Sequence, residues 1–320
     1  MFPKLFMIDT MLIVTGTIAY DHIMDFPGSF SDHILPDQLH KINLSFIVKT
    51  FAKRRGGTAG NVSYSLGLLS APHLLFSVAG NDFPEYRKRF EELDIDLSQV
   101  SIDSSQPSSN GFAMTDKTNN QIWGYFYGAS EGIEKLKLNA IAKSGDLVLI
   151  GPSGASGSMS MVRQCIDLKV DYMFDPGFIL TQVSDEDLKL GVTHAKMVIG
   201  NDYEIELIKK RVPEFESLKK NKITITTLGE KGATIEENGE TISIDPCKPS
   251  EVVDPTGAGD SWRSGFLARY EKGLSLLECG QLGSVVASFV LEKYGTQEHE
   301  FSKASLEERY RQTYNTVIHL

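Results

Sequence analysis

Short apolar stretches recur along the chain, and each is bounded by Gly, Pro, Asn or Asp. They span residues 11–16, 74–80, 146–151, 170–177, 196–202 and 222–229. A continuous apolar run of this length is typical of a strand buried on both faces, as in a parallel sheet. We therefore predict that these segments form one layered, mostly parallel sheet.

Helical periodicity fills several gaps between these strands. Apolar residues recur at helical spacing over residues 61–69, 83–93 and 202–212. Nearer the C-terminus, Ser275–Glu278 and Ser305–Glu308 match the S-x-x-E capping box, which satisfies the first backbone N–H groups of a helix. Strands that alternate with helices predict the α/β fold class, with helices layered on a mostly parallel sheet.

Two segments, about residues 18–53 and 108–128, interrupt this alternation. The first ends in the alternating stretch NLSFIV at residues 43–48, and the second has the pattern of a hairpin that turns at residues 117–120. We predict that both are antiparallel pieces lying off the main sheet, as a small lid. Neither is long enough for a separate domain, so residues 1–320 are expected to form a single domain.

Charge and cysteine usage narrow the class of partner and the compartment. The 32 Lys and Arg residues against 42 Asp and Glu give a net charge of −10. Nucleic acid and anionic membranes require a basic face, so neither is expected as a partner, although a local pocket for a small anion is allowed. Cys165, Cys247 and Cys279 form neither a metal-binding pair nor a disulfide framework. With no apolar run near the ~18 residues of a membrane span, we expect a cytoplasmic protein.

The stretch Val253–Asp260, VDPTGAGD, precedes a helical pattern and contains the most informative motif. The turn Gly257-Ala258-Gly259 would point backbone N–H groups outward at the start of a helix, which makes an anion site. Asp260 is the next residue in the sequence. A carboxylate beside an anion site could act as the base that deprotonates a hydroxyl as it attacks phosphorus. For this motif alone, a tight turn with an acidic residue in the first helical turn is the alternative.

Three further clusters follow strands or open helices. Gly56–Asn61, GGTAGN, could let a ligand approach the backbone while Asn61 offers its amide, or could be a turn that needs positive φ. Asn201 and Glu204 follow a strand, where Glu204 could organise Mg²⁺ through water or lie on the surface as an ordinary helix-opening residue. Thr227–Gly232, TLGEKG, is a strand-end glycine loop or a simple turn.

Several common motifs are absent from the sequence. There is no G-x-x-x-x-G-K-[ST], so a P-loop kinase is excluded, and Gly151, Gly154 and Gly157 lack the spacing of a dinucleotide-binding loop. The seven histidines are scattered and form no H-E-x-x-H motif.

The two glycine clusters, GGTAGN and DPTGAGD, lie in this order about 200 residues apart. They resemble the paired signatures of the ribokinase-like (PfkB) carbohydrate and nucleoside kinases. With TGTIAYDHIMDFPGSFSDHILP, NLSFIV, GNDYEIELI, TTLGEKGA and QLGSVVASFVLEKYGTQE, the resemblance extends from about residue 12 to 297 and is closer to the bacterial adenosine kinases. It implies a ribokinase-like three-layer α/β/α core with a small β-sheet lid, ATP and Mg²⁺ as cofactors, and leaves a monovalent-cation requirement open.

At the phosphate end, the resemblance implies Asp260 as the catalytic base and a specific set of binding residues. The anion hole would be Gly257, Ala258 and Gly259, the ATP loop Thr227, Gly229 and Gly232, and the Mg²⁺-phosphate motif Asn201 and Glu204, the metal being held through water. The sequence departs from the family pattern at Pro255, where the family has a second Thr, and at Trp262, where Phe is commoner.

At the nucleoside end, the resemblance implies that Asp21 holds the ribose hydroxyls and that Gly57 and Asn61 complete this side of the site. Phe112 and Phe126, on the predicted hairpin, would stack on the nucleobase. A small hydrophobic lid core is the alternative role for these two rings.

The reaction implied is transfer of the γ-phosphate of ATP to the 5′-hydroxyl of adenosine. The alternatives are another nucleoside such as inosine or guanosine, a sugar such as ribose or fructose, or a nucleoside-binding sensor without catalysis. A flat aromatic slot distinguishes a nucleoside from a bare sugar, and the joint presence of Asp260, the glycine turn and Glu204 argues against a sensor. Because the lid hairpins would offer exposed strand edges, a homodimer through the lid is a further hypothesis.

Overall fold

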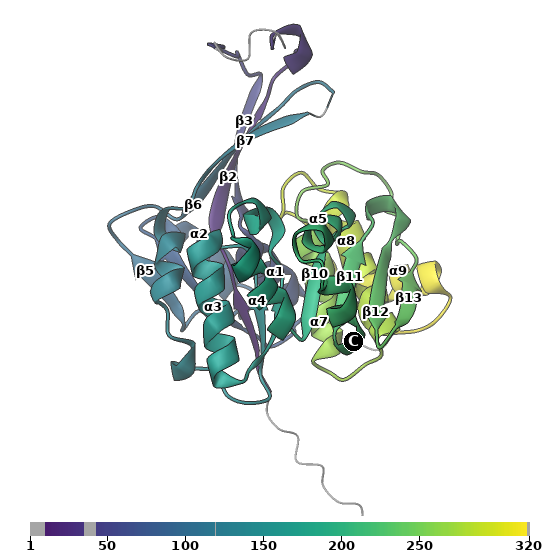
Figure 1. Cartoon of the computed structure of the whole chain (residues 1–320). Coiled ribbons are helices and arrows are strands. Elements are labelled where there is room, and N and C mark those ends of the chain that lie inside the picture. The colour runs from purple at the N-terminus through teal and green to yellow at the C-terminus, as the bar shows by residue number, and fades with distance from the viewer. Residues whose placement is uncertain (1–9, 35–42, 119, 319–320) are drawn as a thin grey trace, which may run out of the picture.

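The computed structural model describes residues 10–34, 43–118 and 120–318, which form a large sheet, flanking helices and a smaller sheet (Figure 1). The large sheet has nine strands in the order β13-β12-β11-β10-β9-β8-β1-β4-β5. The strands from β5 to β11 pair in parallel, whereas β12 and β13 add in antiparallel fashion. Their bounds are β1 Leu12–Thr15, β4 Leu74–Gly80, β5 Val100–Asp103, β8 Leu147–Ile150, β9 Asp171–Phe174, β10 Met197–Asn201, β11 Ile223–Thr227, β12 Ala233–Glu237 and β13 Glu240–Ile244. All six strands predicted from the apolar stretches are confirmed.

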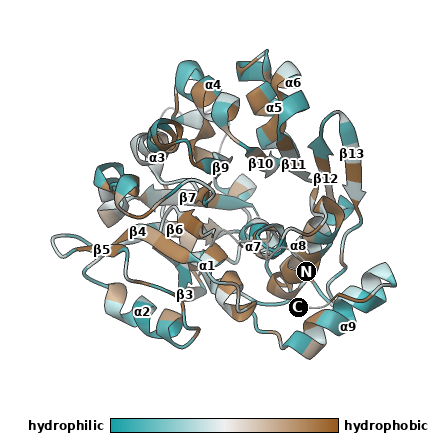
Figure 2. Cartoon of the chain, turned by 90° about the horizontal axis from the view of Figure 1, so that it is seen from below, coloured by the Kyte–Doolittle hydropathy of each residue, from teal (hydrophilic) through white to brown (hydrophobic). Residues whose placement is uncertain are grey.

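Helices cover both faces of this sheet, which gives the predicted three layers (Figure 2). Because neighbouring residues of a strand point to opposite faces, Leu12 and Val14 belong to one core and Ile13 to the other. The first core packs against α1 Thr58–Leu68, α2 Phe83–Glu91, α7 Ala258–Tyr270 and α8 Leu276–Leu291. The second packs against α3 Gly154–Leu168, α4 Asp185–His194, α5 Asp202–Arg211 and α6 Phe215–Leu218.

The start of one late helix differs from the prediction. The Ser275–Glu278 capping box opens α8 as expected, but α9, Lys303–Tyr314, is capped by Ser302 rather than Ser305. Ser302 N donates to Ser305 Oγ at 3.0 Å, and Ser305 N donates to Ser302 Oγ at 3.1 Å, so the capping box forms one turn earlier than expected. Leu306 and Tyr310 of α9 lie on one face and are both buried against α8.

The lid is a four-stranded sheet in the order β3-β2-β6-β7, and it projects from the body of the molecule (Figure 1). Its strands are β2 Ala19–Asp25, β3 Thr50–Gly56, β6 Ser109–Thr115 and β7 Gln121–Phe126. The pairs β2–β3 and β6–β7 are antiparallel, and the two hairpins join through a parallel β2–β6 pairing. The predicted hairpin is confirmed, but residues 43–48 form no strand. They lie beyond Asp25, where the partner strand β2 ends, so the ladder begins only at Thr50.

Short 3₁₀ segments connect these elements. They are η1 Phe30–Asp32, η3 Gly128–Lys135, η4 Leu138–Ala140, η5 Gly177–Thr181, η6 Lys219–Asn221 and η7 Gly229–Lys231. Within the described ranges, no helix combines the length and apolar character needed to cross a bilayer.

Candidate active site

The predicted site residues, apart from Phe112 and Phe126, lie around the carboxyl ends of the parallel strands, where open α/β sheets bind ligands. Asp175 follows β9, Asn201 ends β10 and Thr227 ends β11. The helix α7 starts beside them, and β2 brings Asp21 from the lid. Residues that are far apart in the sequence are therefore gathered at one edge of the sheet.

The glycine turn before α7 has the geometry of an anion site. Gly257 is left-handed, with φ +81°, and a Cβ there would lie 2.8 Å from Thr296 Cβ, so only glycine fits. The backbone N–H of Ala258 makes a long 3.3 Å bond to Pro255 O. The turn lies at the positive end of the α7 dipole, where the first backbone N–H groups of a helix lack intrahelical partners, and the anion hole of Gly257, Ala258 and Gly259 stays a prediction.

Asp260, in the first turn of α7, is half-buried and oriented by Asn61. The Asn61 Nδ2 donates a hydrogen bond of 2.8 Å to Asp260 Oδ2. Asn61 Oδ1 accepts from Gln297 Nε2 at 2.9 Å and lies 2.8 Å from Thr296 Oγ1. These two neighbours fix the orientation of the amide, so its N–H side always faces the carboxylate.

The environment of Asp260 favours a carboxylate that can accept a proton near neutral pH. Burial raises its pKa to about 6, with further raising by the charges of Asp175 and Glu204. The Arg263 guanidinium and the Asn61 hydrogen bond act in the opposite direction. A base with a pKa near the working pH transfers protons most efficiently.

Asp21 lies close to Asp260 and is itself buried, with 8% of its surface exposed. Burial, followed by the charges of Asp260 and Asp254, raises its pKa to about 7. A Cβ on Gly56 would lie 2.1 Å from Asp21 Oδ2, so this glycine makes room for the carboxylate. Gly57, with φ +84°, turns the chain tightly against Thr17 O before α1 begins. The structure thus brings Asp21, Gly57, Asn61 and Asp260 together.

Phe112 and Phe126 do not join this group. The register pairs Phe112 with His22 and Phe126 with Asn110, and His22 stacks on Phe112 at 4.8 Å and contacts Asn110 at 2.7 Å. Asp21 is the neighbour of His22 and therefore points to the opposite face of the lid. The expectation that both phenylalanines lie beside the nucleoside site is wrong in this geometry, because the alternation of each strand turns their rings away from Asp21.

A different set of aromatic side chains lies on the Asp21 face. A Cβ on Gly111 would lie 2.7 Å from Asp21 Oδ1 and 3.0 Å from the Trp123 ring. Tyr125 is on the same face of β7 as Trp123, and its ring centroid lies 5.4 Å from that of Phe178 in η5. These rings were not predicted from the sequence. The alternation of β7 was visible, but the face turned toward the site depends on how β6 pairs with β2.

A cavity of about 950 Å³ adjoins the glycine turn on the side away from the lid. Thr227, Gly229 and Gly232 line it together with Ala258 and Gly259, so the predicted nucleotide loop and the anion site face one space. Its remaining walls include residues 246–252 and the C-terminal half of α8, and Trp262 also lines it. The volume is ample for a small-molecule cofactor.

Asn201 and Glu204 form a complete capping box at the start of α5. Asn201 Oδ1 accepts from Glu204 N at 2.8 Å, and Glu204 Oε2 accepts from Asn201 N at 2.8 Å. Burial and the charge of Asp175 raise the pKa of Glu204. The described residues contain no cluster of three or more His, Cys, Asp and Glu side chains able to hold a metal. Mg²⁺ fits here only with water and phosphate as additional ligands, which is how this ion is commonly bound.

The sequence matches the pfkB family carbohydrate kinases over residues 14–303. The chain belongs to the pfkB family. A nucleoside kinase of Methanothermobacter thermautotrophicus is 32% identical over 295 residues, covering 90% of this chain and 92% of that protein. The structure of Burkholderia thailandensis nucleoside kinase in complex with inosine superposes with a TM-score of 0.88 at 30% identity, covering 96% of this chain and 99% of that one. The structure of its complex with ADP-inosine superposes with a TM-score of 0.85 at 31% identity, covering 96% of this chain and 97% of that one.

Membership of the pfkB family confirms the resemblance drawn from the two glycine clusters. It also confirms the ribokinase-like α/β fold and the assignment as an ATP-dependent phosphotransferase. The site of this pfkB kinase also contains an ion pair that no sequence motif predicted. Arg263 and Asp175 are both buried, and the Arg263 Nε and Asp175 Oδ2 atoms are 2.6 Å apart.

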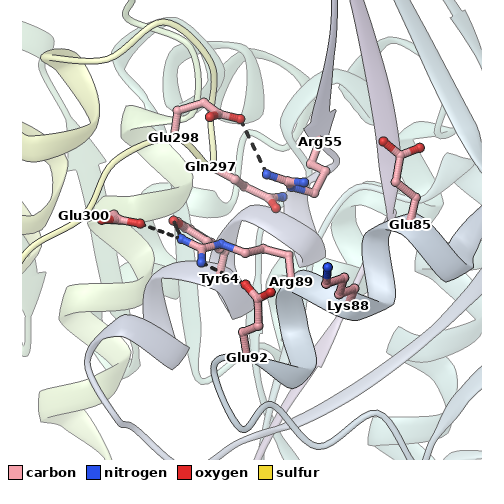
Figure 3. A pocket seen from close by; sticks show the side chains of 9 residues that line it. All are labelled: Arg55, Tyr64, Glu85, Lys88, Arg89, Glu92, Gln297, Glu298 and Glu300. Atoms are coloured by element: carbon pink, nitrogen blue, oxygen red, sulfur yellow. Dashed lines mark hydrogen bonds and ion pairs between the residues drawn. The ribbon is translucent and has the colours of Figure 1, made fainter.

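A second, charged pocket of about 420 Å³ lies behind the Asn61 network (Figure 3). Its wall includes Gln297, whose amide holds Asn61. Arg89 pairs with Glu300 at 2.9 Å and donates to Tyr64, while Arg55 lies 3.6 Å from Glu298. None of the predicted site residues lines this pocket, and these ion pairs join α2 and β3 to the segment that positions Asn61.

Proposed function

We propose that this pfkB kinase transfers the γ-phosphoryl group of ATP to the 5′-hydroxyl of adenosine, with Asp260 as the general base. The observation that carries this proposal is the position of Asp260. Its carboxylate accepts from Asn61 and interacts with Asp21, while Ala258 and Gly259, which directly precede it, line the 950 Å³ cavity. An acceptor hydroxyl and a phosphoryl donor can therefore meet at this carboxylate.

In the proposed reaction, Asp260 takes the proton of the 5′-hydroxyl as its oxygen bonds to the γ-phosphorus, and the bond to the β-phosphate oxygen breaks to release ADP. Phosphoryl transfer has a loose transition state, so the proton can move late and alignment contributes most. The N–H groups of Gly257, Ala258 and Gly259 neutralise charge on the transferred group. Mg²⁺, when bound, would add positive charge near the phosphates, with Asn201 and Glu204 holding it through water.

At the acceptor end, Asp21 would hold the ribose hydroxyls, next to Gly57 and Asn61. We propose Trp123, Tyr125 and Phe178 as the nucleobase slot, in place of Phe112 and Phe126. These flat rings support a nucleoside over a bare sugar, because a free sugar would be surrounded by polar walls. The relatives named nucleoside kinases, one of them bound to inosine, support the same substrate class.

At the donor end, ATP would occupy the 950 Å³ cavity, with Thr227, Gly229 and Gly232 against the nucleotide. Three free, buried cysteine thiols support a location in the reducing cytoplasm. A nucleoside-binding sensor would have no use for a base at the anion site, which makes it the weaker alternative.

The test is release of ADP from ATP with adenosine, inosine, guanosine, cytidine, ribose and fructose offered separately, each with Mg²⁺ and with EDTA. Turnover that depends on Mg²⁺ and is fastest with adenosine is expected. Faster turnover with inosine or another nucleoside would show that adenosine is not the preferred acceptor, while the proposed site residues would stand. Turnover with a sugar alone would refute the aromatic slot, and no turnover with any acceptor would refute the kinase proposal.

A further inference from the structure

The ion pair between Arg263 and Asp175 joins helix α7 to the edge of the sheet. The Arg263 Nε lies 2.6 Å from Asp175 Oδ2, and its Nη2 donates to Asp175 Oδ1 at 2.8 Å. Both residues are more than nine-tenths buried, with 7% and 2% of their surfaces exposed. This two-point contact, one hydrogen bond and one close approach of opposite charges, holds one edge of the guanidinium against the Asp175 carboxylate.

Stability alone does not account for this pair. A buried ion pair is often no more stabilising than well-packed apolar side chains, because desolvation opposes the Coulomb attraction. A cation near the amino end of a helix also gains nothing from the helix dipole. The position of Arg263 therefore calls for another partner.

The third guanidinium nitrogen, Nη1, lies near the glycine turn that precedes Asp260. A Cβ on Gly259 would lie 2.9 Å from Arg263 Nη1, so this nitrogen lies against the glycine turn. Arg263 also follows Asp260 by three residues on α7, a spacing that places two side chains on the same side of a helix. Of its two other nitrogens, Nη2 donates a hydrogen bond to Asp175 and Nε lies beside the same carboxylate.

The charged groups around Asp260 come from several elements. Asp21 on β2, Asp175 after β9 and Glu204 on α5 bring negative charge, while Arg263 on α7 brings positive charge. Asp254, in the loop before α7, acts on Asp21. Ionised Asp260 is thus surrounded by like charges, and Arg263 offsets them. This attraction strengthens when a bound substrate expels water from the site.

We propose that Arg263 is a positioning residue that acts through Asp260, its positive charge keeping that carboxylate ionised, and that Asp175 sets the strength of this effect. The inference rests on the proposed role of Asp260 as base. It makes a specific prediction, because the two ends of the pair carry opposite charge. Removing the positive end must make Asp260 harder to ionise, whereas removing the negative end must make it easier.

The experiment measures the single-turnover rate of phosphoryl transfer against pH at constant ionic strength, with saturating adenosine and MgATP. Bound ribose then occupies Asp21, so the acid limb reports Asp260 in the ternary complex. We expect the acid limb of the pH–rate profile to shift to higher pH by about one unit in Arg263→Met. In Asp175→Asn it should shift to lower pH by a similar amount. The double variant, which leaves no unpaired charge, is expected to return close to the wild-type limb.

The conservative variant Arg263→Lys serves as the rescue, because it keeps the charge but loses the two-point contact. Its limb should stay near that of the wild type even where its rate is lower. Limbs that move in the same direction for Arg263→Met and Asp175→Asn, or that do not move while only the amplitude falls, would show a purely structural clamp. If Arg263→Met does not fold, Asp175→Asn and the double variant still decide through the sign of their shifts. Near-normal turnover of Asp260→Asn would instead refute the proposed base.

Discussion

At the scale of single residues, the proposed mechanism depends most on Asp260 as the base. Replacing it with Asn keeps an oxygen that can accept from Asn61 Nδ2 but removes the ability to take a proton. We expect turnover of Asp260→Asn to fall by at least ~10²-fold, the effect of losing a general base, with the KM values for adenosine and ATP nearly unchanged. Steady-state kinetics measure this.

The matched control for that variant is Asp167→Asn, an exposed carboxylate on helix α3. It should keep wild-type turnover. If Asp260→Asn does the same, Asp260 is not the base and the proposed mechanism fails.

Asp21 gives a second prediction, which concerns stability rather than rate. Because burial and the charges of Asp260 and Asp254 raise its pKa to about 7, the folded protein retains a proton there that the unfolded chain has lost. The free energy of unfolding therefore falls as the pH rises from about 4 to about 7. Asp21→Asn removes this cost, so its gain in Tm over the wild type should be larger at pH 8 than at pH 5, while adenosine binding weakens. Calorimetry at both pH values tests this, and an equal gain at both would contradict the burial argument.

At the scale of elements, the alternation of β6 and β7 separates the aromatic side chains of the lid into two faces. Trp123 lies on the face of Asp21, and Phe112 on the face of His22. We expect Trp123→Ala to raise the KM for adenosine about tenfold, the scale of one lost base-stacking contact, and to leave the KM for ATP unchanged. Phe112→Ala is the control and should alter the KM for adenosine by less than about twofold. If Phe112→Ala has the larger effect, the original expectation for this ring is restored.

Helix starts show where local sequence is sufficient at this scale. The capping boxes at Ser275 and Asn201 form as their sequences indicate, because each needs only backbone groups within three residues. The box expected at Ser305 does not form, because Ser305 instead completes an earlier box whose cap is Ser302. A local signal therefore identifies a helix but does not choose between neighbouring caps.

At the scale of the whole molecule, the lid face opposite Asp21 predicts that two copies of the chain associate. Phe51, Phe112, Ile122 and Phe126 share this face and have between 45% and 64% of their surfaces exposed. A cluster of apolar side chains beside open strand edges is typical of an interface, so we propose a homodimer through the lid. Light scattering at micromolar concentration should give twice the monomer mass, and Phe112→Asp should give the monomer mass. A monomer mass for the wild type would refute the dimer.

The single-domain organisation of residues 1–320 also stays a prediction. Coincident unfolding transitions by two probes would support it.

The sequence by itself determined the features that depend on near neighbours along the chain. The apolar stretches specified the parallel strands, and the Gly257 turn next to Asp260 specified the helix start at which we propose the anion site, since both elements follow from backbone geometry. Only the tertiary structure decided which distant side chains meet. Asn61 contacts Asp260 across 199 residues, and Asp175 contacts Arg263 across 88. The alternating pattern of a strand defines its two faces but not which face is turned toward the site. The pairing of β2 with β6 decides this, and it places Trp123 on the site face and Phe112 on the opposite face.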